Sequence, residues 1–132
     1  MGTIGYLLDT HTFLWAVSED KRLSSSARTI IEDSEINLFV SVVTAYEIMN
    51  KYRIGKLPGY AYVAENYASI LENFNAIELS MNMKHAHYAG EFSWTHRDPF
   101  DRLLAAQSHI EDLTLITNDQ VFDTLSWVTT LW

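Results

Sequence analysis

The stretch Ile4-Gly5-Tyr6-Leu7-Leu8-Asp9 is an unbroken run of apolar and aromatic residues that ends in an acid. Such a run predicts a β-strand buried on both faces, as in a parallel sheet covered by helices. In an open sheet of this kind, the carboxyl ends of the strands share one edge, and ligands bind there. Because Asp9 follows the run directly, we expect it at that edge.

Three further acids stand at comparable places along the chain. Glu47 lies in the first turns of a helix after the predicted strand Asn37–Ser41, and Asp119 follows the predicted strand Leu113–Thr117. Asp101 stands near the start of a later helix. Four carboxylates at one edge of a sheet repel one another unless a cation neutralises them. Hard oxygen ligands favour Mg²⁺ or Mn²⁺, so the pattern predicts a site for such an ion.

Extended and helical segments alternate over the whole chain. Besides the strands named above, we expect strands at Ala76–Leu79 and Trp127–Leu131. We expect a short helix that Thr10 caps and that runs through Leu14, Trp15 and Val17, and further helices from one of Ser24–Ser26 onward, from Val42 or Ala45 to about Arg53, and at Tyr62–Phe74, Asn82–Phe92, Pro99–Glu111 and Asp119–Leu125. This alternation predicts an α/β fold with three layers, in which a mostly parallel central sheet of about five strands has helices on both faces. The length of 132 residues predicts a single domain over residues 1–132.

The composition is that of a globular protein, with 48% hydrophobic residues and no apolar stretch as long as a membrane span. The start of the chain has no basic segment followed by a long apolar core, so we expect no signal peptide. Cysteine is absent, which excludes disulfides, thiolate metal sites and a cysteine nucleophile, and fits a cytoplasmic location.

The formal net charge is −8, so the chain lacks the positive surface that binds nucleic acid tightly without sequence preference. The best local exceptions are Lys51, Arg53, Lys56, Arg97 and Arg102. Any nucleic acid would therefore be held by this middle segment and by bound metal. An acidic surface also suits a basic protein partner.

Each acid also has an ordinary structural interpretation. Asp9 can cap the helix that follows it, and Asp119, or Asn118 beside it, can cap the next one. Glu47 can close a capping box with Thr44, or pair with Lys51 four residues on at the surface. Its apolar neighbours instead indicate partial burial, where a carboxylate needs a partner or a metal.

The helix expected to begin at Pro99 accounts better for Asp98 than for Asp101. Pro99 is favoured at the first helical position, which makes Asp98 the N-cap. Asp101 would then be the third residue of the helix, where the helix dipole favours a negative charge. No single acid decides the function, and the hypothesis of a metal site rests on the set.

The histidines are weaker signals. His85 and His87 are two positions apart on a predicted helix and point in different directions, so we expect surface or half-buried side chains and no zinc pair. His11 lies close to the first acid, but a packing role is favoured. His96 and Arg97 could meet phosphate, although such a pair more often belongs to a solvated loop.

Four blocks of the sequence, in order, resemble those of the PIN-domain ribonucleases, and within them the VapC-type toxins of bacterial toxin–antitoxin pairs. The blocks are Leu7-Leu8-Asp9-Thr10-His11, Ser41-Val42-Val43-Thr44-Ala45-Tyr46-Glu47-Ile48 with Lys51 and Gly55-Lys56-Leu57, His96-Arg97-Asp98-Pro99-Phe100-Asp101-Arg102-Leu103-Leu104-Ala105-Ala106-Gln107, and Leu115-Ile116-Thr117-Asn118-Asp119 with Phe122. The third block is the most specific. The resemblance covers nearly the whole chain, including the final Leu131-Trp132.

The resemblance implies a PIN-like fold and a Mg²⁺- or Mn²⁺-dependent endoribonuclease that acts as a toxin. The acids it implies as metal-binding and catalytic are Asp9, Glu47, Asp101 and Asp119; Thr117 would help to orient the site, and Asp98 would be a supporting acid or a helix cap. Proteins of this type usually form homodimers and bind a cognate antitoxin, whose tail often places an arginine among the acids. The overall acidity of the chain departs from what tight binding of free RNA needs.

Two other classes of function are compatible with an acid after the first strand. An aspartyl-phosphate phosphatase needs a second Asp two residues later, where this chain has His11. A receiver domain needs a lysine after a late strand, and residues 103–132 contain no Lys or Arg. A PIN-like binding module without activity is the remaining alternative, and the presence of all four acids argues against it.

Overall fold

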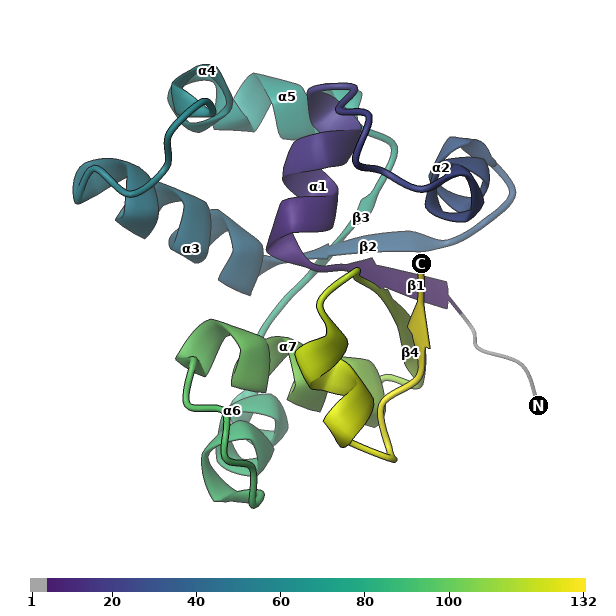
Figure 1. Ribbon diagram of the computed structural model, residues 1–132, viewed down its shortest axis with the longest axis vertical. Coiled ribbons are helices and arrows are strands. Elements are labelled where there is room, and N and C mark those ends of the chain that lie inside the picture. The colour runs from purple at the N-terminus through teal and green to yellow at the C-terminus, as the bar shows by residue number, and fades with distance from the viewer. Residues whose placement is uncertain (1–4) are drawn as a thin grey trace.

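The computed structural model describes residues 5–132 and shows a five-stranded sheet between two layers of helices (Figure 1). The strands are β1 (Gly5–Leu8), β2 (Leu38–Ser41), β3 (Ile77–Leu79), β4 (Leu113–Ile116) and β5 (Thr130–Leu131). Their order is β3-β2-β1-β4-β5, and every neighbouring pair is parallel. The predicted α/β class and the five-stranded parallel sheet are confirmed. Ile4, with which we expected the first strand to begin, lies outside the described residues.

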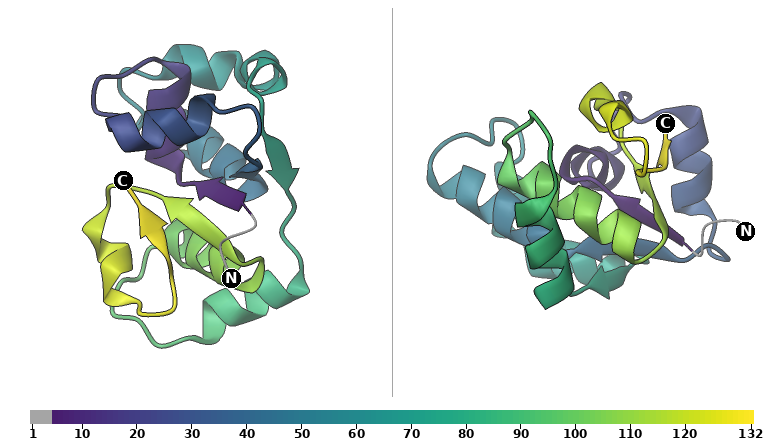
Figure 2. Two further views of the ribbon diagram at one scale, coloured as in Figure 1. Left: turned by 90° about the vertical axis from the view of Figure 1, so that its right-hand side faces the viewer. Right: turned by 90° about the horizontal axis from the view of Figure 1, so that it is seen from below.

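The helices divide between the two faces of the sheet according to the direction in which the chain moves (Figure 2). One face carries α1 (Thr10–Val17), α2 (Ser25–Glu32), α3 (Val42–Arg53), α4 (Ala61–Glu65) and α5 (Tyr67–Asn73), and the other carries α6 (Met83–Glu91), α7 (Pro99–Ile110) and the 3₁₀ helix η1 (Gln120–Thr124). From β1 to β3 the chain moves toward one edge, and from β3 through β4 to β5 it moves toward the other. Because parallel crossovers are right-handed, the two sets of connections cover opposite faces. No helix within residues 5–132 is long and apolar enough to cross a membrane.

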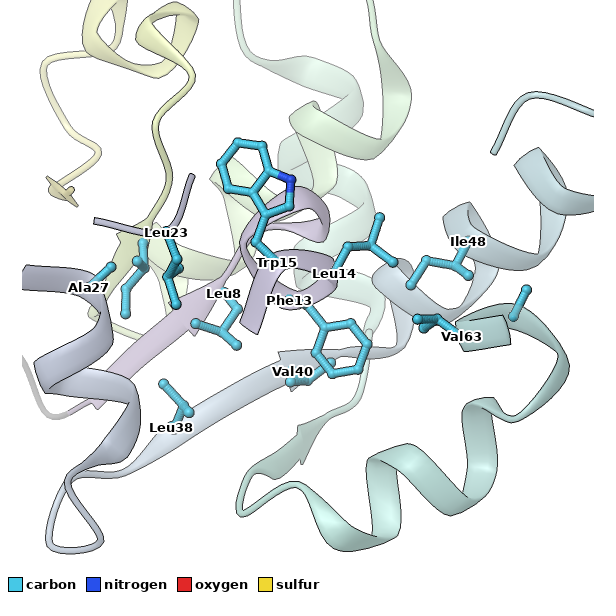
Figure 3. Close-up of a cluster of buried hydrophobic side chains, with 12 residues drawn as sticks. Leu8, Phe13, Leu14, Trp15, Leu23, Ala27, Leu38, Val40, Ile48 and Val63 are labelled. Atoms are coloured by element: carbon cyan, nitrogen blue, oxygen red, sulfur yellow. The ribbon is translucent and has the colours of Figure 1, made fainter. Parts of the chain in front are cut away.

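Neighbouring residues of the buried strands supply two separate cores. Leu8 belongs to the core beneath α1 to α5, together with Phe13 of α1 (Figure 3). Leu7 belongs to the core beneath α7 and η1, together with Leu115 of β4. Successive side chains of a strand point to opposite faces, so an unbroken apolar run can serve both cores. This explains why β1 lacks polar alternation.

Gly5 allows β1 and β2 to lie close together. A Cβ atom at this position would be 2.8 Å from the ring of Phe39 and 2.9 Å from the carbonyl oxygen of Asn37. Tyr6 pairs with Leu38 one residue further along. The small residue therefore helps to set the register that brings the ends of β1 and β2 level.

Two predicted elements differ from the structure. The single helix expected over Tyr62–Phe74 is two helices, because the backbone at Asn66 leaves the helical region with φ −122° and its side chain bonds the carbonyl oxygen of Tyr62 at 2.9 Å. The strand expected from Trp127 is only Thr130–Leu131. Trp127 instead lies in a turn, where its ring packs edge-on against Phe92 with centroids 4.8 Å apart.

Candidate active site

The strand order creates a crevice between the carboxyl ends of β1 and β4. These strands are neighbours, but the chain leaves β1 toward one edge of the sheet and leaves β4 toward the other. Ligands bind at such points of reversal in open α/β sheets. A cavity of about 560 Å³ lies there, lined by Asp9, His11, Trp15, Arg22, Asn118, Asp119 and Gln120. Two of the four predicted acids therefore share one cavity.

Asp9 is buried, with only 6% of its surface exposed, and the groups that donate hydrogen bonds to it, the Thr12 N–H and the Thr117 hydroxyl, are uncharged. It caps α1 by accepting a 2.8 Å hydrogen bond from the backbone N–H of Thr12, so the predicted capping role is confirmed. Its second oxygen accepts a hydrogen bond from the hydroxyl of Thr117. Burial raises the pKa of Asp9, and these two hydrogen bonds oppose the rise. The carboxylate thus stands in a crevice without a cationic hydrogen-bond partner among the described residues.

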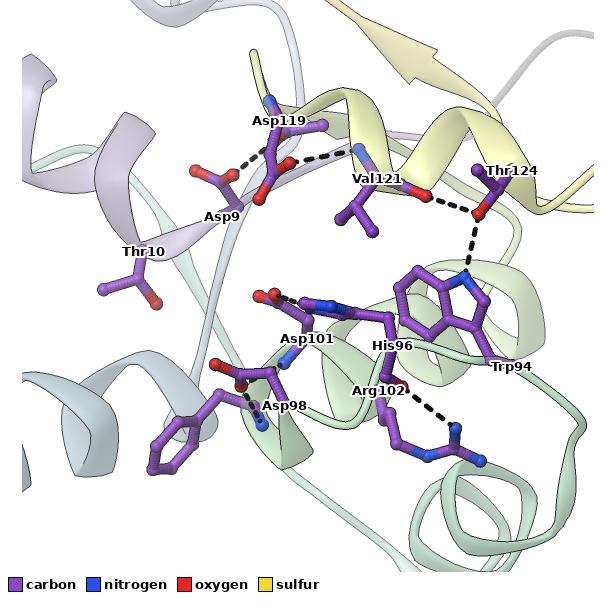
Figure 4. Close-up of polar contacts among 12 residues, drawn as sticks. Asp9, Thr10, Trp94, His96, Asp98, Asp101, Arg102, Asp119, Val121 and Thr124 are labelled. Atoms are coloured by element: carbon purple, nitrogen blue, oxygen red, sulfur yellow. Dashed lines mark hydrogen bonds and ion pairs between the residues drawn. The ribbon is translucent and has the colours of Figure 1, made fainter.

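Thr117 joins Asp9 to the fourth acid. Its hydroxyl oxygen also accepts a 3.0 Å hydrogen bond from the backbone N–H of Asp119. Asp119 is exposed and caps η1 through a 3.0 Å hydrogen bond from the N–H of Val121. Figure 4 shows Asp9 and Asp119 on one side of an open region. The turn after β4 therefore holds both carboxylates in fixed positions.

Glu47 is equally buried, but it has a cationic partner. It accepts hydrogen bonds of 2.6 Å from the hydroxyl of Thr10 and 2.5 Å from the ammonium group of Lys51. The predicted pair with Lys51 is confirmed. It is not a pair at the surface, however, because the carboxylate of Glu47 is buried. The predicted capping box with Thr44 is wrong, because α3 begins earlier, with Ser41 as its cap.

Asp98 and Asp101 open α7 and face Asp9 and Asp119 across the same open region (Figure 4). Asp98 is the predicted N-cap, with hydrogen bonds of 2.9 Å and 3.2 Å from the N–H groups of Phe100 and Asp101. The pKa of Asp101 is raised to about 6, first by burial and then by the charges of Asp98 and Glu47. Repulsion between these groups shows that the acids of α3 and α7 are electrostatically coupled.

The model of the PIN domain family matches residues 6–128. The chain belongs to the PIN domain family. A search of curated protein sequences finds no match.

Solved structures with the same fold share little sequence with this PIN domain. A chain of the VapBC complex from Salmonella typhimurium, solved bound to DNA, is 15% identical with a TM-score of 0.70, and 97% of each chain is covered. A chain of VapBC2 from Rickettsia felis, bound to a DNA fragment from its promoter, is 18% identical with a TM-score of 0.67, and FitAcB from Neisseria gonorrhoeae is 19% identical with a TM-score of 0.64. In both comparisons, 96% of each chain is covered. Identities this low show the fold alone.

His96 is a site residue whose partner sequence reasoning did not identify. Its Nε2 atom lies 2.7 Å from a carboxylate oxygen of Asp101, and this contact lowers the pKa that burial raises. The loop residues before α7 fold back over its first turn. Spacing alone gave no sign of this contact, because a histidine five residues before an acid has no fixed direction in a loop.

His85 is buried, so the expectation of a surface or half-buried side chain was wrong for it. It completes a capping box with Asn82 at the start of α6, and its Nε2 atom lies 2.8 Å from a carboxylate oxygen of Glu111. His87 is exposed, as predicted. The ring of His11 packs against that of Trp15 at an angle of 44°, with centroids 5.9 Å apart, and His11 also lines the cavity of Asp9.

The carboxylates fit a Mg²⁺ or Mn²⁺ ion in chemistry and charge, but they do not form a closed cage. Within residues 5–132, no three acidic or histidine side chains stand close enough together to hold one ion. Mg²⁺ usually keeps several waters and binds through one or two carboxylates, so a pair of acids suffices. Asp9, buried without a cationic hydrogen-bond partner among residues 5–132 and beside Asp119, is the position where a cation would relieve most desolvation.

The structure also changes which basic side chains are available to a ligand. Arg102, one of the expected candidates, donates hydrogen bonds of 2.8 Å and 2.5 Å to the carbonyl oxygens of Ala89 and Phe92. It holds the loop before α7 in place and is not free to meet phosphate. Arg22, which sequence reasoning did not single out, lines the cavity of Asp9.

Proposed function

We propose that this PIN domain is a Mg²⁺- or Mn²⁺-dependent endoribonuclease that acts as the toxin of a toxin–antitoxin pair. The observation that carries the proposal is the buried Asp9 carboxylate, which shares a cavity with Asp119 at the reversal point of the sheet. Its hydrogen-bond donors are uncharged, so a divalent cation supplies the compensation that the described residues do not.

In this proposal the chain's own side chains have distinct roles. Asp9 and Asp119 would be the primary ligands, and Glu47 and Asp101 would complete the site through water, since no three of these side chains stand close enough to share one ion directly. Thr117 holds one oxygen of Asp9 and so fixes the direction of the other, while Asp98 keeps the first turn of α7 in place. When bound, the ion supplies a water of lowered pKa as the nucleophile and charge neutralisation at the phosphate.

A cognate antitoxin is the proposed protein partner. The structural relatives include a toxin–antitoxin complex from Klebsiella pneumoniae, 16% identical with a TM-score of 0.63. An acidic cavity suits the guanidinium group of a partner's arginine, which binds carboxylates through paired hydrogen bonds. We further propose that the protein is a homodimer and acts in the cytoplasm, where a chain without cysteine loses nothing to reduction.

RNA cleavage tests the proposal. The wild type should cut single-stranded RNA in Mn²⁺ or Mg²⁺, leave 5′-phosphate and 3′-hydroxyl ends, and stop when a chelator is added. Asp9→Asn should be inactive, while Asp33→Asn, a matched change at an exposed position, should be as active as the wild type. Cleavage that survives both the chelator and Asp9→Asn would refute the mechanism.

A measurement of metal binding distinguishes the proposed enzyme from the alternative, a PIN-like binding module without activity. If the wild type binds neither Mn²⁺ nor Mg²⁺ in calorimetry and cuts no RNA, the acids are structural caps, as their hydrogen bonds to helix starts would allow. If it binds metal, the inactive module is excluded as the reason for any missing cleavage, and the RNA sequence becomes the variable to search.

A further inference from the structure

A second cavity of about 240 Å³ adjoins the first one. Both cavities are lined by His11 and Arg22, so they lie next to each other beside α1. The second cavity is also lined by Lys51 and Lys56. In a chain of net charge −8 with nine Lys and Arg residues, the gathering of three cations around one small cavity is a marked local reversal of charge.

The local backbone places Lys56 at this cavity. Helix α3 ends at Arg53, and Gly55 then adopts a left-handed conformation with φ +75°. Glycine takes this conformation without steric cost, and it is common just past the end of a helix. The N–H of Lys56 then bonds the carbonyl oxygen of Lys51 at 2.7 Å. The turn therefore folds the chain back, so that both lysines line the same cavity.

The three cations differ in how far they are already neutralised. Lys51 is paired with Glu47, and Arg22 makes two hydrogen bonds of 3.0 Å and 2.7 Å with Asp20. Lys56 is exposed and has no ion pair or side-chain hydrogen bond within residues 5–132. Of the three cations that line the second cavity, Lys56 is therefore the one available to bind an anion.

Arg22 is held rigidly beside it. One of its nitrogens donates a 2.9 Å hydrogen bond to the hydroxyl of Tyr60, and its guanidinium group lies over the ring of Trp15 at 4.9 Å. An arginine fixed in this way loses little freedom when it meets a further acceptor. Leu14, Leu57 and Pro58 also line this cavity, and we call these three residues its apolar floor.

We propose that this cavity binds the nucleotide next to the scissile phosphodiester of a single-stranded RNA, with its phosphate on Lys56 and Arg22 and its sugar or base on the apolar floor. The inference rests on the proposed function for the chemistry of the neighbouring cavity. The basic side chains of the second cavity attract the phosphates of the RNA, whereas the acids of the first cavity repel them. The RNA thereby crosses from a basic cavity to the acids, which explains how so acidic a chain admits its substrate.

The test is equilibrium binding of a fluorescent single-stranded RNA without divalent metal, so that cleavage does not enter. Lys56→Gln should weaken binding by about threefold to tenfold at low salt and lower the slope of log affinity against log salt by about 0.7, as for one lost phosphate contact. Lys56→Arg should retain binding. Lys84→Gln is the matched control, because Lys84 is equally exposed but lies on α6.

Three results would overturn the inference. Binding could be unchanged in Lys56→Gln, it could fall equally in Lys84→Gln, or an acidic peptide could depend on Lys56 while RNA does not. Cleavage with Mn²⁺ is measured separately, and Lys56→Gln should raise KM with kcat nearly unchanged. If Lys56 governs RNA binding as expected but the wild type cuts no RNA, then the proposed function fails and the binding site stands.

Discussion

Asp9 and Glu47 are both buried carboxylates near the same edge of the sheet, yet they are neutralised in different ways. Glu47 accepts a hydrogen bond from Lys51, a cation supplied by its own helix. Asp9 accepts hydrogen bonds from the backbone of Thr12 and the hydroxyl of Thr117, and no lysine or arginine within residues 5–132 bonds to it. The charge of Glu47 is therefore neutralised by a residue of the fold. The charge of Asp9 is not, and it can be neutralised by a bound cation.

This difference separates an acid whose charge is neutralised by a lysine of the fold from one whose charge is open to a ligand. Burying a carboxylate without a cation costs free energy, and burial raises the pKa of Asp9 accordingly. Such a cost is tolerated at a functional site and is recovered when a ligand binds the folded state. The two acids should therefore respond in opposite directions when each is made neutral.

The largest expected effect is that of Asp9→Asn. RNA cleavage should fall on the order of 10³-fold or more, because the contribution of a metal ion to catalysis is several kcal/mol. The midpoint temperature of thermal unfolding without metal should rise, since Asn keeps an acceptor for the N–H of Thr12 and removes the buried charge. A loss of stability together with a loss of activity would show that the charge of Asp9 stabilises the fold, and would contradict the account.

Removing the hydroxyl groups that support the two acids should sharpen the contrast. Thr117→Val removes a hydrogen-bond donor of Asp9, and affinity for Mn²⁺ should fall about 10- to 100-fold, as for supporting groups at other metal sites. Thr10→Val removes a donor of Glu47, which keeps Lys51, so its effect on metal affinity should be smaller. Calorimetric titration measures both, and equal effects would contradict the distinction.

The pH dependence of stability tests the buried charge at Asp101. Burial is the largest of the effects that raise its pKa to about 6, from the 3.8 that is ordinary for an aspartate. The folded protein therefore keeps this proton over a pH range in which the unfolded chain has lost it. The free energy of unfolding without metal should fall by about 3 kcal/mol as the pH rises through that range, at roughly 1.4 kcal/mol for each unit of pKa. Denaturant titrations at several pH values should show a smaller fall in Asp101→Asn.

The smallest expected effect is that of Glu47→Gln on stability. The change breaks the pair with Lys51, and it should lower the free energy of unfolding by about 1 kcal/mol, because the lysine side chain is 30% exposed and can regain water. Glu72→Gln, at an exposed position of α5, is the control. Stabilisation by Glu47→Gln would remove the contrast with Asp9.

The buried strands, and the helix starts marked by proline or an acid, were predictable because their causes are local. The run ending at Leu8 contains no polar residue, and Asp98 before Pro99 is a complete signal for a helix start. The position of Asp9 at the sheet edge followed from the end of its strand. These features need only neighbouring residues and the periodicity of a strand or helix.

The remaining features depend on contacts between distant segments. Nothing near Asn66 in the sequence marks the break between α4 and α5, since asparagine is tolerated within helices. The contact between His96 and Asp101 depends on the path of a loop, and the burial of His85 depends on the packing of α6 against α7. Arg22 likewise comes to line a cavity with Lys51 and Lys56 only in the folded chain.

The most direct measurement of the central claim is calorimetric titration of Mn²⁺ into the wild type, Asp9→Asn and Asp33→Asn at neutral pH. We expect the wild type and Asp33→Asn to bind with the same affinity, and Asp9→Asn to show no binding under the same conditions. Equal binding by Asp9→Asn and the wild type, or no binding by the wild type, would contradict the assignment of Asp9 as the acid that awaits a cation.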